Sequence, residues 1–430
     1  MIRIIHYEGQ PVETLLSRAS EPTRDVTDTV AAILADVKTR GDEAVLDYCE
    51  RFDGTRPAAL LVTQAEIDAA FTRVSPELIA TMQLAAENIR RFHLQQKRNG
   101  FVDAKEDGVV LGQRVLPLAS VGLYVPGGTA RYPSSVLMDA IPAQIAGVKQ
   151  IIMTTPPDRD GNVPDVILAA ASIAGVSQIV KLGGAQAIAA LAYGTQSVPR
   201  ADKIVGPGNV YVATAKQLCY AQGLIDIDMV AGPSEILVIA DAASNPAHVA
   251  ADLLSQAEHD TLSAAWLVTS SEAFAVQVRA ELERQLPKLE REAIARQSID
   301  QNGRAIIVPD LATAAMVSNA IAPEHLEICT DDPFALLPLI EHAGSVFLGR
   351  FCPEPLGDYL AGPNHTLPTS GTARYSSPLG VDDFVKRSSF IYYTREALMK
   401  VGQDVRRFAE HEGLTAHANA IAIRMEETNE

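Results

Sequence analysis

From about Val115 onward, the sequence alternates short β-branched runs with glycine turns and helical segments, and this rhythm limits the possible folds more than any other feature. The first runs lie at 121–125, 151–153, 179–182, 204–205 and 236–239. A second series follows, with strands expected at 264–268, 304–308, 326–328 and 345–348 and a helix at 311–321. Because strands that alternate with helices imply right-handed crossovers and a mainly parallel sheet, the sequence predicts an α/β protein with two α/β units.

Helices are expected on either side of this region. Asp25 is expected to cap a helix that stops at Gly41, a second helix runs from Asp42 to about Phe52, and Ser75-Pro76 opens a longer one. Beyond Ser376 the pattern ends in helices, at 397–410 and 414–425.

Four glycine loops are expected to follow strands, at 124–128, 183–186, 206–209 and 232–235. In parallel sheets ligands bind beyond the carboxyl ends of the strands, so these loops are expected to carry the chemistry. A nucleotide is a natural ligand, because glycine permits close approach of the backbone. However, the sequence contains neither G-x-G-x-x-G nor G-x-x-x-x-G-K-[ST], and the nearest match, at Gly206, has Tyr211 in place of the third glycine. Purely structural turns would explain any one of these loops equally well.

Composition narrows the class of partner. The 430 residues carry a formal net charge of −17 and no basic run, which argues against nucleic acid. Four cysteines without a Cys-x-x-Cys pair fit reduced thiols in a cytoplasmic protein. The first residues do not resemble a signal peptide, and no apolar run approaches the length that spans a membrane. A small-molecule ligand is therefore favoured.

Gln256 and His259 form a candidate metal-binding pair at the end of an apolar helix that begins after Asn245-Pro246. Their i, i+3 spacing places them on one face, and an amide oxygen and an imidazole nitrogen are acceptable zinc ligands. Two ligands do not hold a catalytic metal, and a solvated helix end is the alternative interpretation. Asp358, after Gly357, offers another oxygen, although a turn-forming aspartate is equally consistent.

Glu324 and His325 form a candidate acid/base pair. They follow Ala322-Pro323, which favours a turn, and in a turn both side chains can face one cavity. Histidine titrates near neutral pH, and a partly buried glutamate can be raised toward it, as proton transfer at pH 7 requires. A structural histidine remains an equally open interpretation.

Several separate segments, in order, resemble the histidinol dehydrogenase family over nearly the whole chain. They are the glycine loops and the segments 255–259, 322–326, 362–365 and 412–417. The resemblance implies oxidation of L-histidinol to L-histidine through a bound aldehyde, with two NAD molecules and one zinc ion per subunit, in the last step of histidine biosynthesis. The alternatives are a zinc- and NAD-dependent paralogue that oxidises another small alcohol, such as sulfopropanediol, a zinc hydrolase without NAD, and a non-catalytic metal-binding protein.

The resemblance also implies roles for individual residues. The implied zinc ligands are Gln256, His259, Asp358 and His417. The implied catalytic acid/base pair is Glu324 and His325. The implied substrate contacts are Ser234, Gln256, His259, His325, Asp358, His365, Glu412 and His417. The implied NAD contacts are Tyr124, Gln186 and Asn209. The family forms cytoplasmic homodimers, in which the partner's C-terminal tail would complete each site.

The expected architecture is two incomplete, non-classical Rossmann-like parallel-sheet domains with small additions at both ends. Residues 1–22 are expected to form an N-terminal arm, and residues 377–430 a small helical C-terminal domain. Residues 23–120 with 236–376 are expected to form a discontinuous first α/β domain, and residues 121–235 the second.

Overall fold

The computed structural model describes residues 1–16, 26–105, 108–127, 131–230 and 232–426. The chain forms two compact units, one of Met1–Gln96 with Leu118–Phe384 and one of Lys97–Pro117 with Val385–Glu430. Asp25, Gly128 and residues 17–22 of the expected arm lie outside the described residues. Within the described ranges, no helix combines the length and apolar character needed to cross a membrane.

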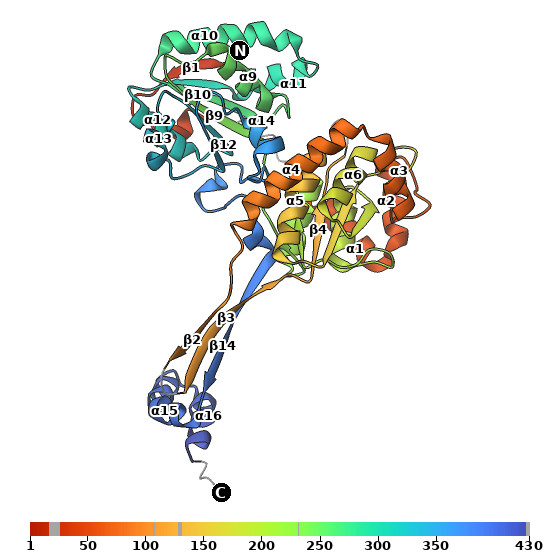
Figure 1. The fold of residues 1–430 in the computed structure, drawn as a ribbon, viewed down its shortest axis with the longest axis vertical. Helices are drawn as coiled ribbons and strands as arrows, with labels where there is room; N and C mark the ends of the chain where they lie inside the picture. The colour runs from red at the N-terminus through yellow and green to blue at the C-terminus, as the bar shows by residue number, and fades with distance from the viewer. Residues whose placement is uncertain (17–25, 106–107, 128–130, 231, 427–430) are drawn as a thin grey trace. The chain divides into compact units, whose positions relative to one another are not determined.

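The first unit contains a five-stranded parallel sheet of order β6-β5-β4-β7-β8. Its strands are β4 (Ser120–Tyr124), β5 (Gln150–Thr155), β6 (Gln178–Lys181), β7 (Lys203–Val205) and β8 (Asp226–Ile227). One face packs against α3 (Gln64–Arg73), α4 (Pro76–Leu94), α5 (Pro133–Ala146) and α6 (Asp165–Ala174). The other packs against α1 (Thr27–Arg40), α2 (Asp42–Phe52), α7 (Gly184–Tyr193) and α8 (Val210–Ala221). The helices α1 to α6 are labelled around β4 in Figure 1. Cover on both faces explains why these strands are almost continuously apolar.

A six-stranded parallel sheet of order β1-β11-β10-β9-β12-β13 completes the first unit. Its strands are β1 (Arg3–His6), β9 (Glu235–Ala240), β10 (Ala264–Thr269), β11 (Arg304–Ile307), β12 (His325–Cys329) and β13 (Ser345–Leu348). The helices α9 (Pro246–Ala257), α10 (Glu272–Gln285) and α11 (Glu292–Asn302) cover one face. The helices α12 (Leu311–Ile321) and α13 (Pro333–Leu336) cover the other.

The predicted α/β class with parallel sheets is confirmed, but the elements group differently from the expected domains. The helices of residues 27–94 pack on the five-stranded sheet, whereas the sequence pattern predicts one domain of residues 23–120 with residues 236–376. Arg3–His6, expected to belong to an arm, is the edge strand of the six-stranded sheet. An apolar helix face shows that a helix covers a sheet without showing which sheet, and this explains the difference.

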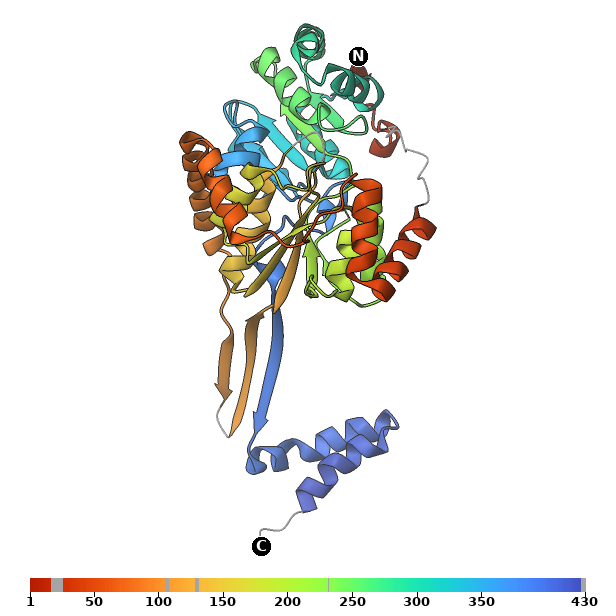
Figure 2. The same ribbon diagram turned by 90° about the vertical axis from the view of Figure 1, so that its right-hand side faces the viewer.

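The second unit is an antiparallel sheet followed by two helices. The sheet has the order β14-β3-β2, with β2 (Phe101–Lys105), β3 (Val109–Pro117) and β14 (Val385–Tyr393). Helices α15 (Arg395–His411) and α16 (Thr415–Glu426) lie side by side, as Figure 2 shows, and Gly402 leaves no room for a Cβ atom beside Met425. The two tail helices are as predicted, but residues 377–430 are not entirely helical, because residues 385–393 form a strand.

Candidate active site

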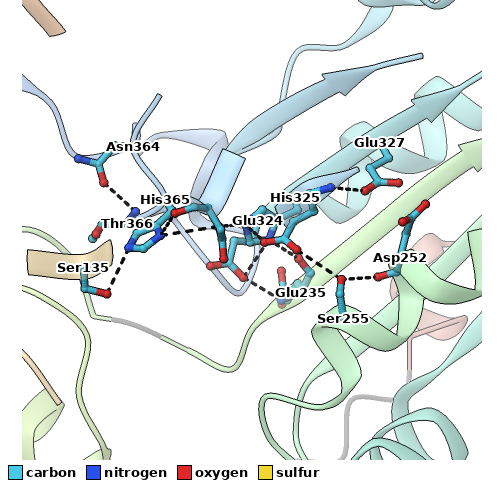
Figure 3. A network of polar contacts seen from close by, with 12 residues as sticks. Ser135, Glu235, Asp252, Ser255, Glu324, His325, Glu327, Asn364, His365 and Thr366 are labelled. Atoms are coloured by element: carbon cyan, nitrogen blue, oxygen red, sulfur yellow. Dashed lines mark hydrogen bonds and ion pairs between the residues drawn. The ribbon is translucent and has the colours of Figure 1, made fainter. Parts of the chain in front are cut away.

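The candidate acid/base pair is held by the backbone of Glu235, the first residue of the neighbouring strand β9. The Glu235 N–H donates to Glu324 Oε2 at 2.8 Å, and the Glu235 carbonyl lies 2.9 Å from His325 Nδ1, as Figure 3 shows. Ala322, which ends α12 with a left-handed φ of 51°, turns the chain toward β12. Since Nδ1 and Oε2 lie 3.5 Å apart, the two side chains share one location.

This pair lies at the amino end of β12, directly before the strand that the sequence predicts at 326–328. His325 is the first residue of β12, and its register partner Ile236 is the second residue of β9. The loop at 232–235 accordingly precedes β9 rather than closing it. Its Ser234, an expected substrate contact, is partly exposed and adjoins Glu235.

The hydrogen bond of His325 fixes its neutral tautomer. A carbonyl oxygen only accepts, so Nδ1 carries the proton and Nε2 carries the lone pair. Among the described residues, Nε2 is buried without a hydrogen-bond partner, and its nearest acids are Glu354 at 3.8 Å and Asp358 at 3.9 Å. Burial lowers the pKa of His325, against the opposing effect of Glu354, so the ring is a neutral base.

Two buried carboxyl groups, those of Glu324 and Glu354, and the partly exposed carboxyl group of Asp358 surround the ring. Glu354 begins α14 (Glu354–Leu356), and Asp358 lies in the single π-helical turn η4 (Gly357–Ala361). Burial, followed by the charge of Asp358, raises the pKa of Glu354 to about 7, and burial raises the pKa of Asp358 to about 6. Burial also raises the pKa of Glu324 well above its ordinary value. A site of this kind stabilises a cation, because ionised carboxylates that are crowded together repel one another.

The candidate metal pair at the end of α9 borders these acids. Gln256 is 1% exposed, and neither atom of its side-chain amide has a hydrogen-bond partner in the described ranges. The amide lies beside the Glu354 carboxyl without an ordinary hydrogen-bond geometry. His259 is solvent-exposed as a residue, yet the surrounding protein lowers its pKa by desolvation while Glu354 opposes the shift.

His365 joins this cluster to the helix α5. Its ring nitrogens lie 3.1 Å from the Asp358 carbonyl (Nδ1) and 3.2 Å from Ser135 Oγ (Nε2), and burial lowers its pKa to about 4. The adjacent Thr366 donates from Oγ1 to Asp139 Oδ1 at 2.9 Å, which ties the same loop to α5 a second time. A cavity of about 140 Å³ is lined by His325, Asp358, His365 and other residues of the segment 345–367.

A larger cavity, of about 1280 Å³, lies at the carboxyl ends of the five-stranded sheet. The three expected NAD contacts all line it: Tyr124 ends β4, Gln186 lies in the first turn of α7, and Asn209 caps α8. The Gly184 N–H donates to the Tyr124 hydroxyl at 3.1 Å, and the Gln186 Nε2 is buried without a partner among the described residues. For this sheet, the position expected from the sequence and the position of the cavity agree.

Glu412 and His417 belong to the second unit, where both are exposed. Glu412 ends α15, and His417 lies in the first turn of α16. Within the first unit the structure therefore brings together Gln256, Glu324, His325, Asp358 and His365.

Sequence reasoning missed Glu235 and Glu354. Glu235 acts through its backbone, which carries no residue-specific signal. Glu354 precedes Asp358 by four residues, and the Pro353-Glu354-Pro355 context was the one available indication.

The donor set fits a divalent zinc ion. The buried oxygen of the Gln256 amide has no partner in the described part of the chain, and Asp358 supplies a carboxylate. Ligand atoms of His325, Glu354 and Asp358 lie within 4.8 Å of one another. A buried polar atom without a partner is costly unless a ligand satisfies it, and amide, imidazole and carboxylate donors suit zinc.

One parallel sheet with a buried imidazole–carboxylate pair, and another with a large cavity, are features of an α/β enzyme. A family model described as histidinol dehydrogenase matches residues 16–425. The histidinol dehydrogenase of Syntrophotalea carbinolica is 54% identical over 434 residues, which cover 100% of both chains. That of Geobacter sulfurreducens is 53% identical over 414 residues, which cover 96% of each. The chain belongs to the histidinol dehydrogenase family, an oxidoreductase family, and the resemblance of its motifs is confirmed.

The same family appears among solved structures. The crystal structure of histidinol dehydrogenase from Elizabethkingia anophelis superposes with a TM-score of 0.94 at 40% identity, over 99% of this chain and 98% of that one. The fold and the motifs thus point to the same family.

Proposed function

We propose that this chain oxidises L-histidinol to L-histidine through bound L-histidinaldehyde, with two NAD molecules, in the last step of histidine biosynthesis. The observation that carries the proposal is the Glu324–His325 pair, anchored on Glu235 beside the buried amide of Gln256. Relatives at 49% to 54% identity are named histidinol dehydrogenases, so a paralogue that oxidises another small alcohol is not favoured.

The metal would be held by Gln256, His259 and Asp358 with the partner's His417. Bound zinc would act as a Lewis acid that holds and orients the substrate's alcohol and nitrogen groups. The pattern of unpartnered donors and crowded carboxyl groups supports this assignment. Ser234, His365 and the partner's Glu412 would contact the substrate around it.

His325 would remove the alcohol proton through Nε2. Its Nδ1–H is bound to the Glu235 carbonyl, so the ring is already the correct tautomer and is already oriented. Burial lowers its pKa and keeps the lone pair available at neutral pH. NAD, bound against Tyr124, Gln186 and Asn209, would accept the hydride.

Glu324 would act in the second oxidation, as the base that activates water to hydrate the aldehyde. The Glu235 N–H holds Oε2 at 2.8 Å, which leaves Oε1 to accept a proton from water. Burial raises the pKa of this carboxyl, which makes it a stronger base than an exposed glutamate. Holding the aldehyde between the two steps would also protect it.

A homodimer would bring a partner's tail to each site. The second unit exposes large apolar side chains, including Ile391 at 71%, Phe408 at 73% and Ile423 at 52% of their surface. Large apolar side chains exposed on β14, α15 and α16 of one small unit are available to an interface with another protein. This surface supports the proposal that a partner's α15 and α16 supply Glu412 and His417.

The test is the stoichiometry of the reaction. Purified protein is supplied with L-histidinol and NAD, and the NADH formed per substrate consumed is counted. A ratio of two is expected, a ratio of one would indicate a simple alcohol dehydrogenase, and no NADH would contradict the proposal. A chelator should abolish turnover, and added zinc should restore it.

A further inference from the structure

We propose that Glu354 is a positioning residue that orients the side-chain amide of Gln256, so that its oxygen faces the metal. The inference rests on the proposed function, because it concerns the zinc site described above. It assigns a role to a buried carboxyl group that the family resemblance left without one.

The orientation of this amide needs a cause. The two ends of a glutamine side chain are nearly equal in shape, but only the oxygen has a lone pair that binds a cation, while the NH₂ group donates two hydrogen bonds. Gln256 is 1% exposed, and both its Oε1 and its Nε2 lack a partner in the described ranges. A buried amide of this kind is satisfied when a cation or a hydrogen-bond donor meets its oxygen and an acceptor meets its nitrogen.

Glu354 is placed to be that acceptor. Its carboxyl is 2% exposed, lies beside the Gln256 amide and has one oxygen, Oε1, without a hydrogen-bond partner among the described residues. A carboxylate only accepts, so it would attract the Nε2 end of the amide and turn Oε1 of Gln256 away from itself.

Two contacts hold Glu354 in this position. Its other oxygen, Oε2, lies 3.3 Å from Ser255 Oγ, whose one hydroxyl hydrogen is shared with the Asp252 carbonyl at 2.8 Å, and Ser255 directly precedes Gln256 on α9. Its backbone N–H donates to Glu327 Oε1 at 2.7 Å, which fixes α14 against β12. The acceptor is therefore built into the fold.

A different role for Glu354 would be that of a metal ligand, since its carboxyl lies close to Asp358 and His325. The two roles differ in one respect. A ligand acts on the metal directly, whereas a positioning residue acts through the amide of Gln256. Exchanging the carboxyl group at position 354 with the amide at position 256 distinguishes these two roles.

The experiment measures the zinc affinity of the full-length, metal-stripped protein by competition with a chromophoric chelator. Glu354→Gln should weaken zinc binding about 10- to 100-fold, as loss of an outer-shell partner does. Gln256→Glu should also weaken it, because two carboxylates then face each other. The double variant, Glu354→Gln with Gln256→Glu, restores one amide and one carboxylate and should recover affinity to within about threefold of the unchanged protein.

Two controls complete the design. Glu258→Gln removes the same charge near the same helix end and should change zinc affinity less than about twofold. Cobalt at saturation should give the same visible spectrum in Glu354→Gln as in the unchanged protein, because no ligand is lost. Thermal unfolding of each metal-free variant reports whether it folds.

The outcomes are distinguishable. Recovery in the double variant with an unchanged cobalt spectrum supports the inference. Additive losses in the double variant, a changed cobalt spectrum in Glu354→Gln, or zinc affinity that tolerates Glu354→Gln would each overturn it. If the unchanged protein binds no zinc, the proposed zinc site is wrong, and the inference about Glu354 is wrong with it. This outcome is distinct from the three above, in which the unchanged protein binds zinc.

Discussion

At the scale of single residues, Glu235 holds Glu324 through its N–H and His325 through its carbonyl, and the proposed function gives these two side chains different tasks. We expect Glu324→Gln to spare oxidation of the alcohol to the aldehyde and to slow oxidation of the aldehyde about 10²- to 10⁴-fold, the usual contribution of a general base. The glutamine oxygen can still accept from Glu235, so the local structure should persist. Single-turnover NADH formation from L-histidinol and from L-histidinaldehyde measures the two steps separately.

The matched control for this variant is His325→Asn, which should slow alcohol oxidation instead, because it removes the Nε2 lone pair. Overall turnover that is unchanged in Glu324→Gln would contradict the assignment.

Asp139 supplies a second prediction, on stability. Burial, and then the charge of Asp228, raises the pKa of the Asp139 carboxyl from 3.8 to about 7. The folded state therefore binds this proton more tightly than the unfolded state, and stability falls as the pH rises from 3.8 to about 7. Asp139→Asn keeps an oxygen for Thr366 and removes this loss, so it should stabilise the protein by up to about 4 kcal/mol at pH 8 and by much less at pH 4.5.

Urea unfolding at the two pH values measures the difference between Asp139→Asn and the unchanged protein. If the difference in the free energy of unfolding does not grow between pH 4.5 and pH 8, the pKa of the Asp139 carboxyl is not raised in the folded state.

At the scale of elements, the sequence predicts well what depends on local pattern. The buried parallel strands could be located because residues such as Ile236 to Ile239 form continuous apolar runs between turns. The strand Val385–Tyr393 was missed, because most of its residues are exposed and it pairs with β3, about 270 residues earlier in the chain.

The candidate site shows the same division. Gln256 and His259 were recognisable as a pair because their spacing at one helix end is local, although α9 ends at Ala257 and His259 lies in the turn that follows. Glu354 was not recognisable, because its importance comes from burial beside groups about a hundred residues away in sequence. Residues from separate segments are connected by tertiary packing, and here the family resemblance supplied the connection that the local pattern lacked.

At Gly206, in the loop after β7, the backbone lies too close to Tyr124 for any side chain to fit. Gly206 has a φ of +109°, and a Cβ atom there would lie 2.2 Å from the Tyr124 carbonyl oxygen. Gly206→Ala must therefore displace the end of β4 and the cavity that Tyr124 lines. We expect NAD affinity to fall at least about tenfold and stability to fall by roughly 1–3 kcal/mol, as measured by calorimetric titration and urea unfolding.

Gly223→Ala is the matched control for that loop. Gly223 also has a positive φ, of +68°, but an added Cβ atom would meet nothing within 4 Å. The Gly223→Ala protein should lose some stability to backbone strain and should keep the NAD affinity of the unchanged protein. Equal effects of the two substitutions on NAD binding would contradict the role assigned to the Gly206 loop.

At the scale of the whole molecule, the expected ligand set is divided between the two units of the chain. Gln256 and Asp358 belong to the first unit, and His417 belongs to the second. The apolar side chains that the second unit exposes support an interface with another copy. Mixed dimers of two variants can show whether the His417 at a given site comes from the same subunit or from its partner.

That answer comes from heterodimers of two inactive variants, His325→Asn and His417→Ala, co-expressed with different affinity tags. If the tail of one subunit completes the site of the other, one site of each heterodimer combines an intact His325 with an intact partner tail. The heterodimer should then show about half the turnover of the unchanged dimer, while both parent homodimers stay inactive. If each tail served its own subunit, both sites would carry a lesion, and the purified heterodimer would be as inactive as its parents.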